Sequence, residues 1–252
     1  MTLLDYLRRV GKKKKEVIYP FTLDWMHADM HSHLIPGIDD GAKTMEESIA
    51  LIKRLHGHGL KKIVTTPHIM SEYYKNTPEI IRSGLERVRE TLKEEQIDID
   101  IHAAAEYYMD EIFLEKVNNG EELLCIHDNL VLVETGFINK PQMLLETFFA
   151  MELKGYRPVF AHPERYHYLI QDKALQNELM DRQILFQINL LSLTGFYSKQ
   201  VKQFAEFLID QEKVAFWGTD CHNERYLDML ETLNRSSYYE KIMNAPVRNR
   251  LL

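Results

Sequence analysis

Five short clusters of metal-ligating residue types recur along the chain, each at the end of an apolar run. They are His31-Ser-His33, Thr66-Pro-His68, Ala105-Glu106, Ala161-His162-Pro and Asp220-Cys-His222. A single His-x-His pair is weak evidence, because a lone histidine at a strand end is more often structural. Five such clusters together favour a pocket for more than one divalent metal ion, and therefore metal-assisted hydrolysis.

Apolar segments rich in Val, Ile and Phe alternate with helix-like segments from Trp25 onward. Strands are predicted near 27–33, 61–67, 98–105, 130–135, 157–162, 184–190 and 214–220. Helices are predicted near 44–58, 78–96, 109–117, 141–155, 172–182, 198–211 and 224–234. Seven strand-then-helix units predict a parallel sheet covered by helices. The expected fold class is α/β, as a distorted (β/α)7 barrel, with a doubly wound open sheet as the alternative.

Local signals agree with several of these helix boundaries. Thr44 followed by Glu47 resembles a capping box, and Pro78 and Pro141 suit the first turn of a helix. Gly59 stands where a helix is expected to end.

The candidate ligands fall at the C-terminal ends of the predicted strands, or just beyond them. They are His31, His33, His68, Glu106, Glu134, His162, Asp220 and His222. Active sites of barrels are built at that face. His31 and His33 share one face of a strand, and Asp29 shares it and is expected to orient a ligand. Asp40 lies in a turn-forming segment that can return its carboxylate over the strand end. The alternative is that Asp39 and Asp40 are both simply turn residues.

Nitrogen and oxygen ligands without thiolate suit Mn²⁺, Fe or Zn²⁺ better than Ca²⁺ or a structural zinc. Arg165, three positions after His162, could hold phosphate oxygens by paired hydrogen bonds, although an exposed loop arginine is the alternative. Arg225 is a weaker second candidate. Cys221 stands between two ligands, and its side chain is expected to point away from them.

The composition bounds the class of protein. The chain has 252 residues, of which 45% are hydrophobic, and this length suits one large domain. A net charge of −7 and the lack of a basic, aromatic groove argue against nucleic acid as a partner. Two cysteines make no disulfide framework, and neither a signal peptide nor an apolar run long enough to span a bilayer is evident, so a cytoplasmic protein is expected.

Residues 1–25 differ from residues 26–252, which are read as one domain. Arg8, Arg9 and Lys12 to Lys15 place six positive charges within eight positions. The segment is interpreted either as a solvated extension or as a basic arm that touches anionic lipid or an acidic partner.

The segment from Asp29 to Gly41, Asp-Met-His-Ser-His-Leu-Ile-Pro-Gly-Ile-Asp-Asp-Gly, resembles the opening motif of the PHP (polymerase and histidinol phosphatase) superfamily. Its second half resembles bacterial tyrosine-protein phosphatases encoded with capsule and exopolysaccharide genes. Segments 65–68, 133–137, 161–166 and 219–222 are similar to the same group, so the likeness covers about residues 26 to 235. Two departures are the basic extension and Gly136, where relatives often carry a bulkier or polar residue.

The resemblance implies a distorted seven-unit barrel with a trinuclear, commonly manganese-dependent site. By position, the eight strand-end residues above would be ligands, Asp40 would complete the set, and Arg165 would contact phosphate. The implied reaction is hydrolysis of phosphotyrosine by direct attack of a metal-bound hydroxide, with His222 or Asp40 assisting the leaving phenolate.

The implied substrate is the tyrosine-rich tail of a membrane-associated bacterial tyrosine kinase, at the inner face of the membrane. Two alternatives stay open. One is a small-molecule phosphatase of the histidinol-phosphate type, and the other is a non-catalytic, metal-bound regulator that binds phosphotyrosine.

Overall fold

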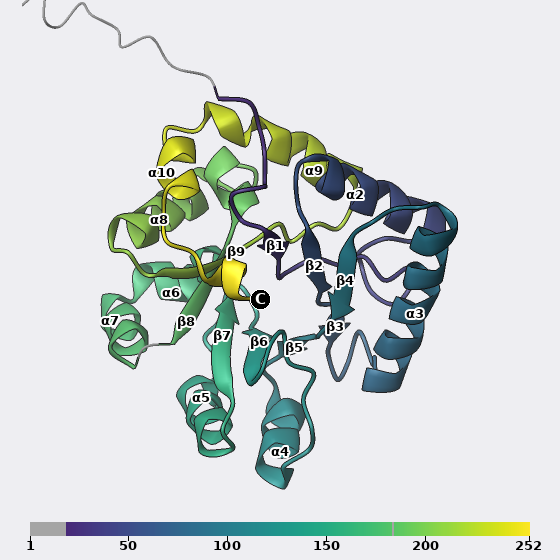
Figure 1. Ribbon diagram of the computed structural model, residues 1–252. Coiled ribbons are helices and arrows are strands. Elements are labelled where there is room, and N and C mark those ends of the chain that lie inside the picture. Colours follow the sequence, from purple (N-terminus) through teal and green to yellow (C-terminus); the bar gives the residue numbers. More distant parts are fainter. Residues whose placement is uncertain (1–18, 183) are drawn as a thin grey trace, which may run out of the picture.

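The structure, a computed structural model, describes residues 19–182 and 184–252, and its strands lie at the centre with helices around them (Figure 1). The strands are β1 (Ala28–Asp29), β2 (Lys62–Thr65), β3 (His68–Ile69), β4 (Asp100–Ala103), β5 (Glu106–Tyr108), β6 (Leu130–Glu134), β7 (Arg157–Ala161), β8 (Leu185–Asn189) and β9 (Val214–Gly218). The α-helices are α2 (Met45–Gly57), α3 (Pro78–Glu94), α4 (Glu111–Asn119), α5 (Leu144–Leu153), α6 (His167–Gln171), α7 (Lys173–Asp181), α8 (Lys199–Asp210), α9 (Glu224–Leu230) and α10 (Tyr239–Met243). Short 3₁₀ helices are η1 (Pro163–Arg165), η2 (Leu190–Thr194), η3 (Glu231–Arg235) and η4 (Arg248–Leu251).

The strands form two parallel sheets in the orders β1-β2-β4 and β3-β5-β6-β7-β8-β9. The predicted strands 61–67 and 98–105 are each interrupted, so that β2 is followed by β3 and β4 by β5. Pro67 lies in the first interruption, and its nitrogen has no hydrogen to donate to a ladder. Strand order follows chain order without the reversal that a doubly wound sheet requires, so the seven-unit barrel is the better description.

The first and last strands meet just beyond their carboxyl ends. A parallel bridge joins Ser32 to Cys221, the amide of Asp220 donates to the carbonyl of His31 at 2.8 Å, and the amide of His33 donates to Cys221 at 3.0 Å. This contact brings the two ends of the strand series together at the face where the candidate ligands lie.

Earlier along both β1 and β9, a side chain links the same two strands. The Asn249 amide donates to the carbonyls of Ala28 on β1 and Trp217 on β9, at 2.9 and 2.8 Å, and accepts from the Trp217 amide at 2.9 Å. Asn249 is fully buried. Within the described residues β1 and β9 share no ladder of their own, so Asn249 supplies hydrogen bonds that a neighbouring strand would otherwise provide.

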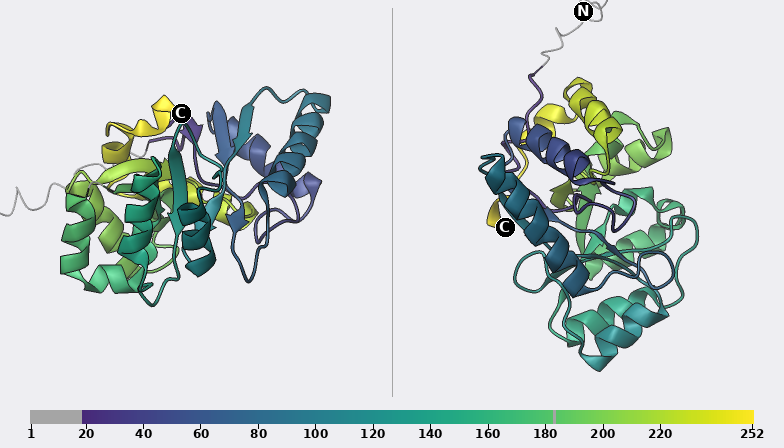
Figure 2. Two further views of the ribbon diagram at one scale, coloured as in Figure 1. Left: turned by 90° about the horizontal axis from the view of Figure 1, so that it is seen from below. Right: turned by 90° about the vertical axis from the view of Figure 1, so that its right-hand side faces the viewer.

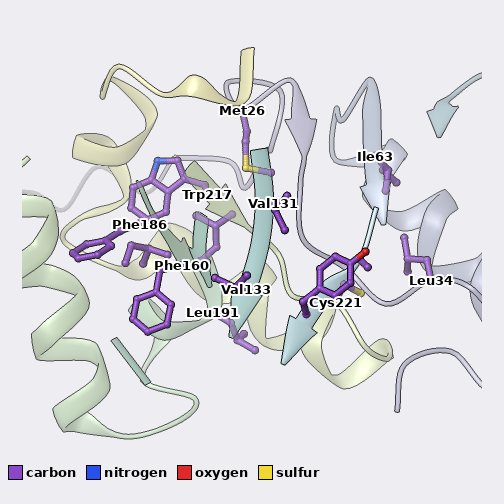
Figure 3. Packing of buried hydrophobic residues seen from close by; sticks show 14 of the residues in the cluster. Met26, Leu34, Ile63, Val131, Val133, Phe160, Phe186, Leu191, Trp217 and Cys221 are labelled. Atoms are coloured by element: carbon purple, nitrogen blue, oxygen red, sulfur yellow. The ribbon is translucent and has the colours of Figure 1, made fainter. Parts of the chain in front are cut away.

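The strands are apolar on both faces, as expected for a parallel sheet covered by helices. Side chains facing inward form a small cluster of their own. It includes Leu130 and Leu132 of β6 and Val159 and Ala161 of β7. The intervening outward-facing residues, among them Val131, Val133 and Phe160, belong to the larger cluster under the helices (Figure 3).

Residues 19–25, the described part of the expected extension, pack on the domain. Leu23 and Trp25 are buried, and the Leu23 amide donates to the carbonyl of His58 at 2.7 Å. Figure 2 shows this segment leading into β1. The basic cluster lies outside the described residues. Within the described residues, no helix combines the length and apolar character needed to cross a bilayer.

All seven predicted helices are present, with shifts of a few residues at their ends. Thr44 caps α2 by accepting from the amide of Glu47, and Pro78 occupies the first turn of α3, as predicted. Gly59, with φ +101°, follows the end of α2. The prediction for Pro141 is wrong, because α5 begins only at Leu144.

Replacing Asn249 with Ala is expected to lower the free energy of unfolding by roughly 2–4 kcal/mol, because the Trp217 amide and the Ala28 carbonyl lose a buried partner. Urea denaturation checks this. The exposed Asn244→Ala variant is the control, with an expected change below about 0.5 kcal/mol. Equal stability of the two variants would contradict the role given to Asn249.

Candidate metal centre

The predicted ligands converge at the carboxyl ends of the strands. Four groups have ligand atoms that all lie within 4.8 Å of one another. They are His33-Asp40-His68-His222, His31-His33-Asp220, His31-Glu106-His162 and His68-Glu106-Glu134. Every residue predicted as a ligand belongs to at least one group, and Asp40 alone among them is exposed.

Glu106 lies at the centre of the cluster. Its Oε2 is 3.1 Å from His31 Nε2 and 3.4 Å from His33 Nε2, and its Oε1 is 3.0 Å from His162 Nε2. A carboxylate placed between imidazoles in this way can bridge two ions, whereas one imidazole nitrogen binds a single ion.

The two carboxylate oxygens of Asp220 contact different groups. Its Oδ1 is 3.4 Å from Nε2 of both His31 and His33. Its Oδ2 accepts hydrogen bonds from Asn189 Nδ2 at 2.6 Å and from Arg165 Nη1 at 3.1 Å. One carboxylate therefore connects the histidine pair to the candidate phosphate-binding arginine.

The remaining ligands lie nearer the solvent. Glu134 Oε1 is 3.1 Å from His68 Nε2 and has no hydrogen-bond partner, although it is buried. Asp40 Oδ1 lies 3.4 Å from His68 Nδ1 and 3.5 Å from His222 Nε2. An unpartnered buried carboxylate oxygen and an exposed carboxylate beside imidazole nitrogens are suitable ligands for a divalent ion.

The charges of the cluster compensate one another. Burial alone lowers the pKa of His31, but the carboxylates of Glu106 and Asp220 raise it above its ordinary value. Burial and the His33 charge lower the pKa of His68, yet Glu134 and Asp39 raise it to about 10. Burial works against ionisation of Glu106, and the His31 and His162 rings hold the pKa of that carboxyl well below its usual range. Metal ions bound here would displace protons from these imidazoles.

Two candidate ligands have an unusual backbone conformation. His162 and Asp220, which follow β7 and β9, have φ values of +32° and +49°. Non-glycine residues rarely adopt this left-handed region, and such strain concentrates at functional sites. Gly218 is also required, because a Cβ there would lie 2.6 Å from Gln187 Nε2 and 2.7 Å from His31 Cβ.

Strand β8 supplies two residues that sequence analysis missed. Gln187 Oε1 is 2.7 Å from His31 Nδ1, and Gln187 Nε2 donates to Asn189 Oδ1 at 2.9 Å. Asn189 in turn donates to Asp220. Both are buried and follow Leu185 at alternate positions on the inward face of β8. This switch from apolar to polar residues was the available signal.

Asp39 is more than a turn residue. Its Oδ2 is 2.8 Å from His33 Nδ1 and accepts from the His68 amide at 3.1 Å, while its Oδ1 accepts from the Gly41 amide at 3.0 Å. It therefore fixes the ring of His33 so that Nε2 faces the cluster.

Asp29, expected to orient a ligand, accepts a hydrogen bond from the backbone amide of His31 at 3.4 Å and does not contact its ring. Its carboxylate accepts from the amide of Thr219 at 2.9 Å and from the Thr219 hydroxyl at 2.6 Å, and burial raises its pKa to about 6. Asp29 thus ties β1 to the end of β9, and Gln187 orients the His31 ring instead. The Cys221 side chain packs in the larger apolar cluster, away from the ligands, as predicted (Figure 3).

Arg165 lies between two aromatic rings. Its guanidinium carbon is 4.3 Å from the centroids of both Phe137 and Tyr197. Stacking and the bond to Asp220 fix the plane of the cation. Arg225 lies over Phe196, 5.4 Å from the ring centroid, and is not among the residues lining the cavity beside Arg165.

That cavity has a volume of about 220 Å³. Its walls combine candidate ligands with Arg165 and with aromatic side chains. The aromatic lining residues are Tyr74, Tyr108, Phe137 and Tyr226. A cation, several metal-ligating groups and flat apolar walls together suit an aromatic phosphate ester.

The parallel strands bring imidazoles, carboxylates and a fixed guanidinium together at their carboxyl ends. This is the arrangement of a metal-dependent phosphoesterase. The chain belongs to the CpsB/CapC family of capsular polysaccharide synthesis, whose family model matches residues 27–245.

Relatives within this group are similar over most of the chain. The tyrosine-protein phosphatase YwqE of Bacillus subtilis is 32% identical over 198 residues, covering 77% of this chain and 77% of that protein. The tyrosine-protein phosphatase CpsB of Streptococcus pneumoniae is 30% identical over 200 residues, covering 77% of this chain and 82% of that protein. A crystal structure from work on YwqE and CpsB, described as unique metal-dependent tyrosine phosphatases, matches with a TM-score of 0.72 and 28% identity, over 82% of this chain and 90% of the other.

Glu164, beside Arg165, is a buried carboxyl group outside the ligand cluster. Its Oε1 accepts from the Asn189 amide at 2.9 Å and the Ser192 hydroxyl at 2.6 Å, whereas Oε2 has no partner. Burial raises the pKa of Glu164 from 4.5 to about 7. The folded state therefore favours the neutral form.

Because the folded pKa of Glu164 exceeds the unfolded value, its contribution to stability is complete below pH 4.5 and is lost as pH rises to about 7. Glu164→Gln, which cannot ionise, should lack this loss. The free energy of unfolding of Glu164→Gln minus that of wild type should therefore increase by roughly 3 kcal/mol between pH 4.5 and pH 8. Urea denaturation of the metal-free proteins measures the difference, and a pH-independent difference would show that Glu164 is ionised in the folded state.

Proposed function

We propose that this protein is a metal-dependent protein-tyrosine phosphatase linked to capsule or exopolysaccharide synthesis. The observation that carries the proposal is the convergence of the predicted ligands beside a fixed guanidinium. Seven of the nine line one cavity, and His31 and His33 are buried next to them. The names of the relatives support phosphotyrosine as the substrate.

The cofactor would be three divalent ions, most simply Mn²⁺, with Fe or Zn²⁺ as alternatives. The donor set fits, because it combines imidazole nitrogens with carboxylate oxygens and includes no thiolate. The ligands would be His31, His33, Asp40, His68, Glu106, Glu134, His162, Asp220 and His222. Bound ions would lower the pKa of water to near neutrality and neutralise phosphoryl oxygens.

The side chains of the chain itself would position the ester. Arg165 would hold phosphoryl oxygens with the guanidinium nitrogens that do not bond to Asp220, at an orientation set by Phe137 and Tyr197. The aromatic walls would hold the phenyl ring. Asp40 and His222, which reach the solvent side of the cluster, would stabilise or protonate the departing phenolate.

The physiological partner would be a phosphotyrosine-containing protein, such as the tyrosine-rich tail of a membrane-associated bacterial kinase. The protein would then act in the cytoplasm, at the inner face of the membrane. The basic cluster within residues 1–18 would contribute attraction to anionic lipid, of roughly 1 kcal/mol per positive charge near the surface.

Phosphate release from a phosphotyrosyl peptide should disappear when purified protein is chelated and should return with Mn²⁺. His33→Ala should lower both activity and bound metal, by at least about tenfold in activity. His102→Ala, an exposed histidine outside the cluster, is the matched control. Turnover of histidinol phosphate but not of the peptide would favour the small-molecule phosphatase, and binding of the peptide without turnover would favour a regulator.

Arg165→Lys retains the charge but loses the planar fork and the double stacking. The variant should therefore show a kcat/KM for phosphotyrosyl peptide reduced by about 10–100-fold, with bound metal retained. Kinetics unchanged from wild type would remove Arg165 from the phosphate site.

Deletion of residues 1–18 should weaken sedimentation with vesicles containing anionic lipid, because six positive charges are lost. Turnover of a small aryl phosphate should stay the same. Equal sedimentation of the two proteins would count against a membrane-directed arm.

A further inference from the structure

A second cavity, of about 350 Å³, adjoins the candidate active site. Met70 and Tyr108 line both cavities and form the wall between them. The second cavity is also lined by Ile69, Ser71, Asp110, Ile112 and Lys116.

The surface of this cavity is mainly apolar. Ile69 and Ile112 contribute aliphatic wall, and Ile112 keeps 49% of its surface exposed at the start of α4. Several polar groups at the margin already have partners. The Ser71 hydroxyl donates to Asp110 at 2.5 Å, and Lys116 donates to Glu121 at 2.8 Å. An apolar ligand would therefore gain by covering exposed hydrocarbon.

We propose that this cavity binds an apolar side chain of the substrate polypeptide close to the phosphotyrosine. The inference rests on the proposed function, because it assumes that a phosphotyrosyl side chain occupies the neighbouring cavity. With that ring against Tyr108, an extended substrate backbone can pass over the rim that the two cavities share.

Chain geometry supports one occupant of this kind. An extended chain advances about 3.3 Å per residue, so a residue two or three positions from the phosphotyrosine lies about 7–10 Å away along the backbone. Alternate residues of an extended chain point to the same side, so the second neighbour can face the same surface as the phosphotyrosine. An aliphatic or aromatic side chain there would contact Ile112.

The test compares two phosphotyrosyl peptides that differ only at the positions two residues before and after the phosphotyrosine, which are leucine in one and alanine in the other. The enzyme is the full-length, Mn²⁺-loaded protein. Wild type should show a kcat/KM about tenfold higher for the leucine peptide. Ile112→Glu should abolish this preference while leaving hydrolysis of p-nitrophenyl phosphate unchanged. Leu153→Glu, on α5 and 70% exposed, is the control variant and should behave as wild type.

Each outcome bears on a distinct claim. Equal turnover of the two peptides by wild type, or a leucine preference retained in Ile112→Glu, would overturn the apolar subsite while leaving the phosphatase assignment intact. Hydrolysis of neither peptide by the metal-loaded wild type would overturn the proposed function, and with it the subsite.

Discussion

The carboxylate of Glu106 lies in the interior among the imidazoles of His31, His33 and His162, and the rest of the site is arranged around this group. Taking so many ionisable groups out of water is costly unless each faces a partner of opposite charge or a metal ion. The barrel provides this pairing by ending neighbouring parallel strands at one face, so that ligands far apart in sequence meet within a few ångströms.

The candidate ligands are held by a layer of polar residues behind them. Gln187 and Asn189 on β8 orient His31 and Asp220, and Asp39 orients His33. Such partners fix which ring nitrogen is presented to the site and raise the basicity of the ligand. The same Asp220 carboxylate also contacts Arg165, so the candidate phosphate-binding group and the candidate metal centre share one support.

Much of this arrangement could be predicted from the sequence, because the strands of a parallel barrel are apolar runs. The residues that follow them form the active site and are polar. His68 and Glu106, for example, could be placed near the ends of two apolar runs, although in the structure each begins a further short strand, β3 or β5. The interruption of two strands could not be predicted, because Pro67 lies in only one of them and the other, at Ala104 and Ala105, has no sequence signal.

Ordinary polar residues were harder to predict than ligands. Asn249 is a common residue type with no characteristic spacing, and only its burial and hydrogen bonds show what it does. Gln187 is marked only by the change from apolar to polar residues along β8, which does not tell that it contacts His31. Asp39 and Asp40 are adjacent acidic residues in a turn, and the sequence does not tell which of them faces solvent. The structure separates them: Asp39 is buried against His33, and Asp40 is exposed beside His68 and His222.

The most direct test of the central claim is the number of manganese ions bound per chain, measured by plasma mass spectrometry after chelation, reloading with Mn²⁺ and removal of free ions. The claim is that the converging side chains form one polynuclear metal centre around Glu106. It predicts about three ions per chain in wild type and fewer in Glu106→Gln, because that variant loses a carboxylate that would hold the ions. A wild-type protein that retains no manganese, or a Glu106→Gln variant that retains as much as wild type, would contradict it.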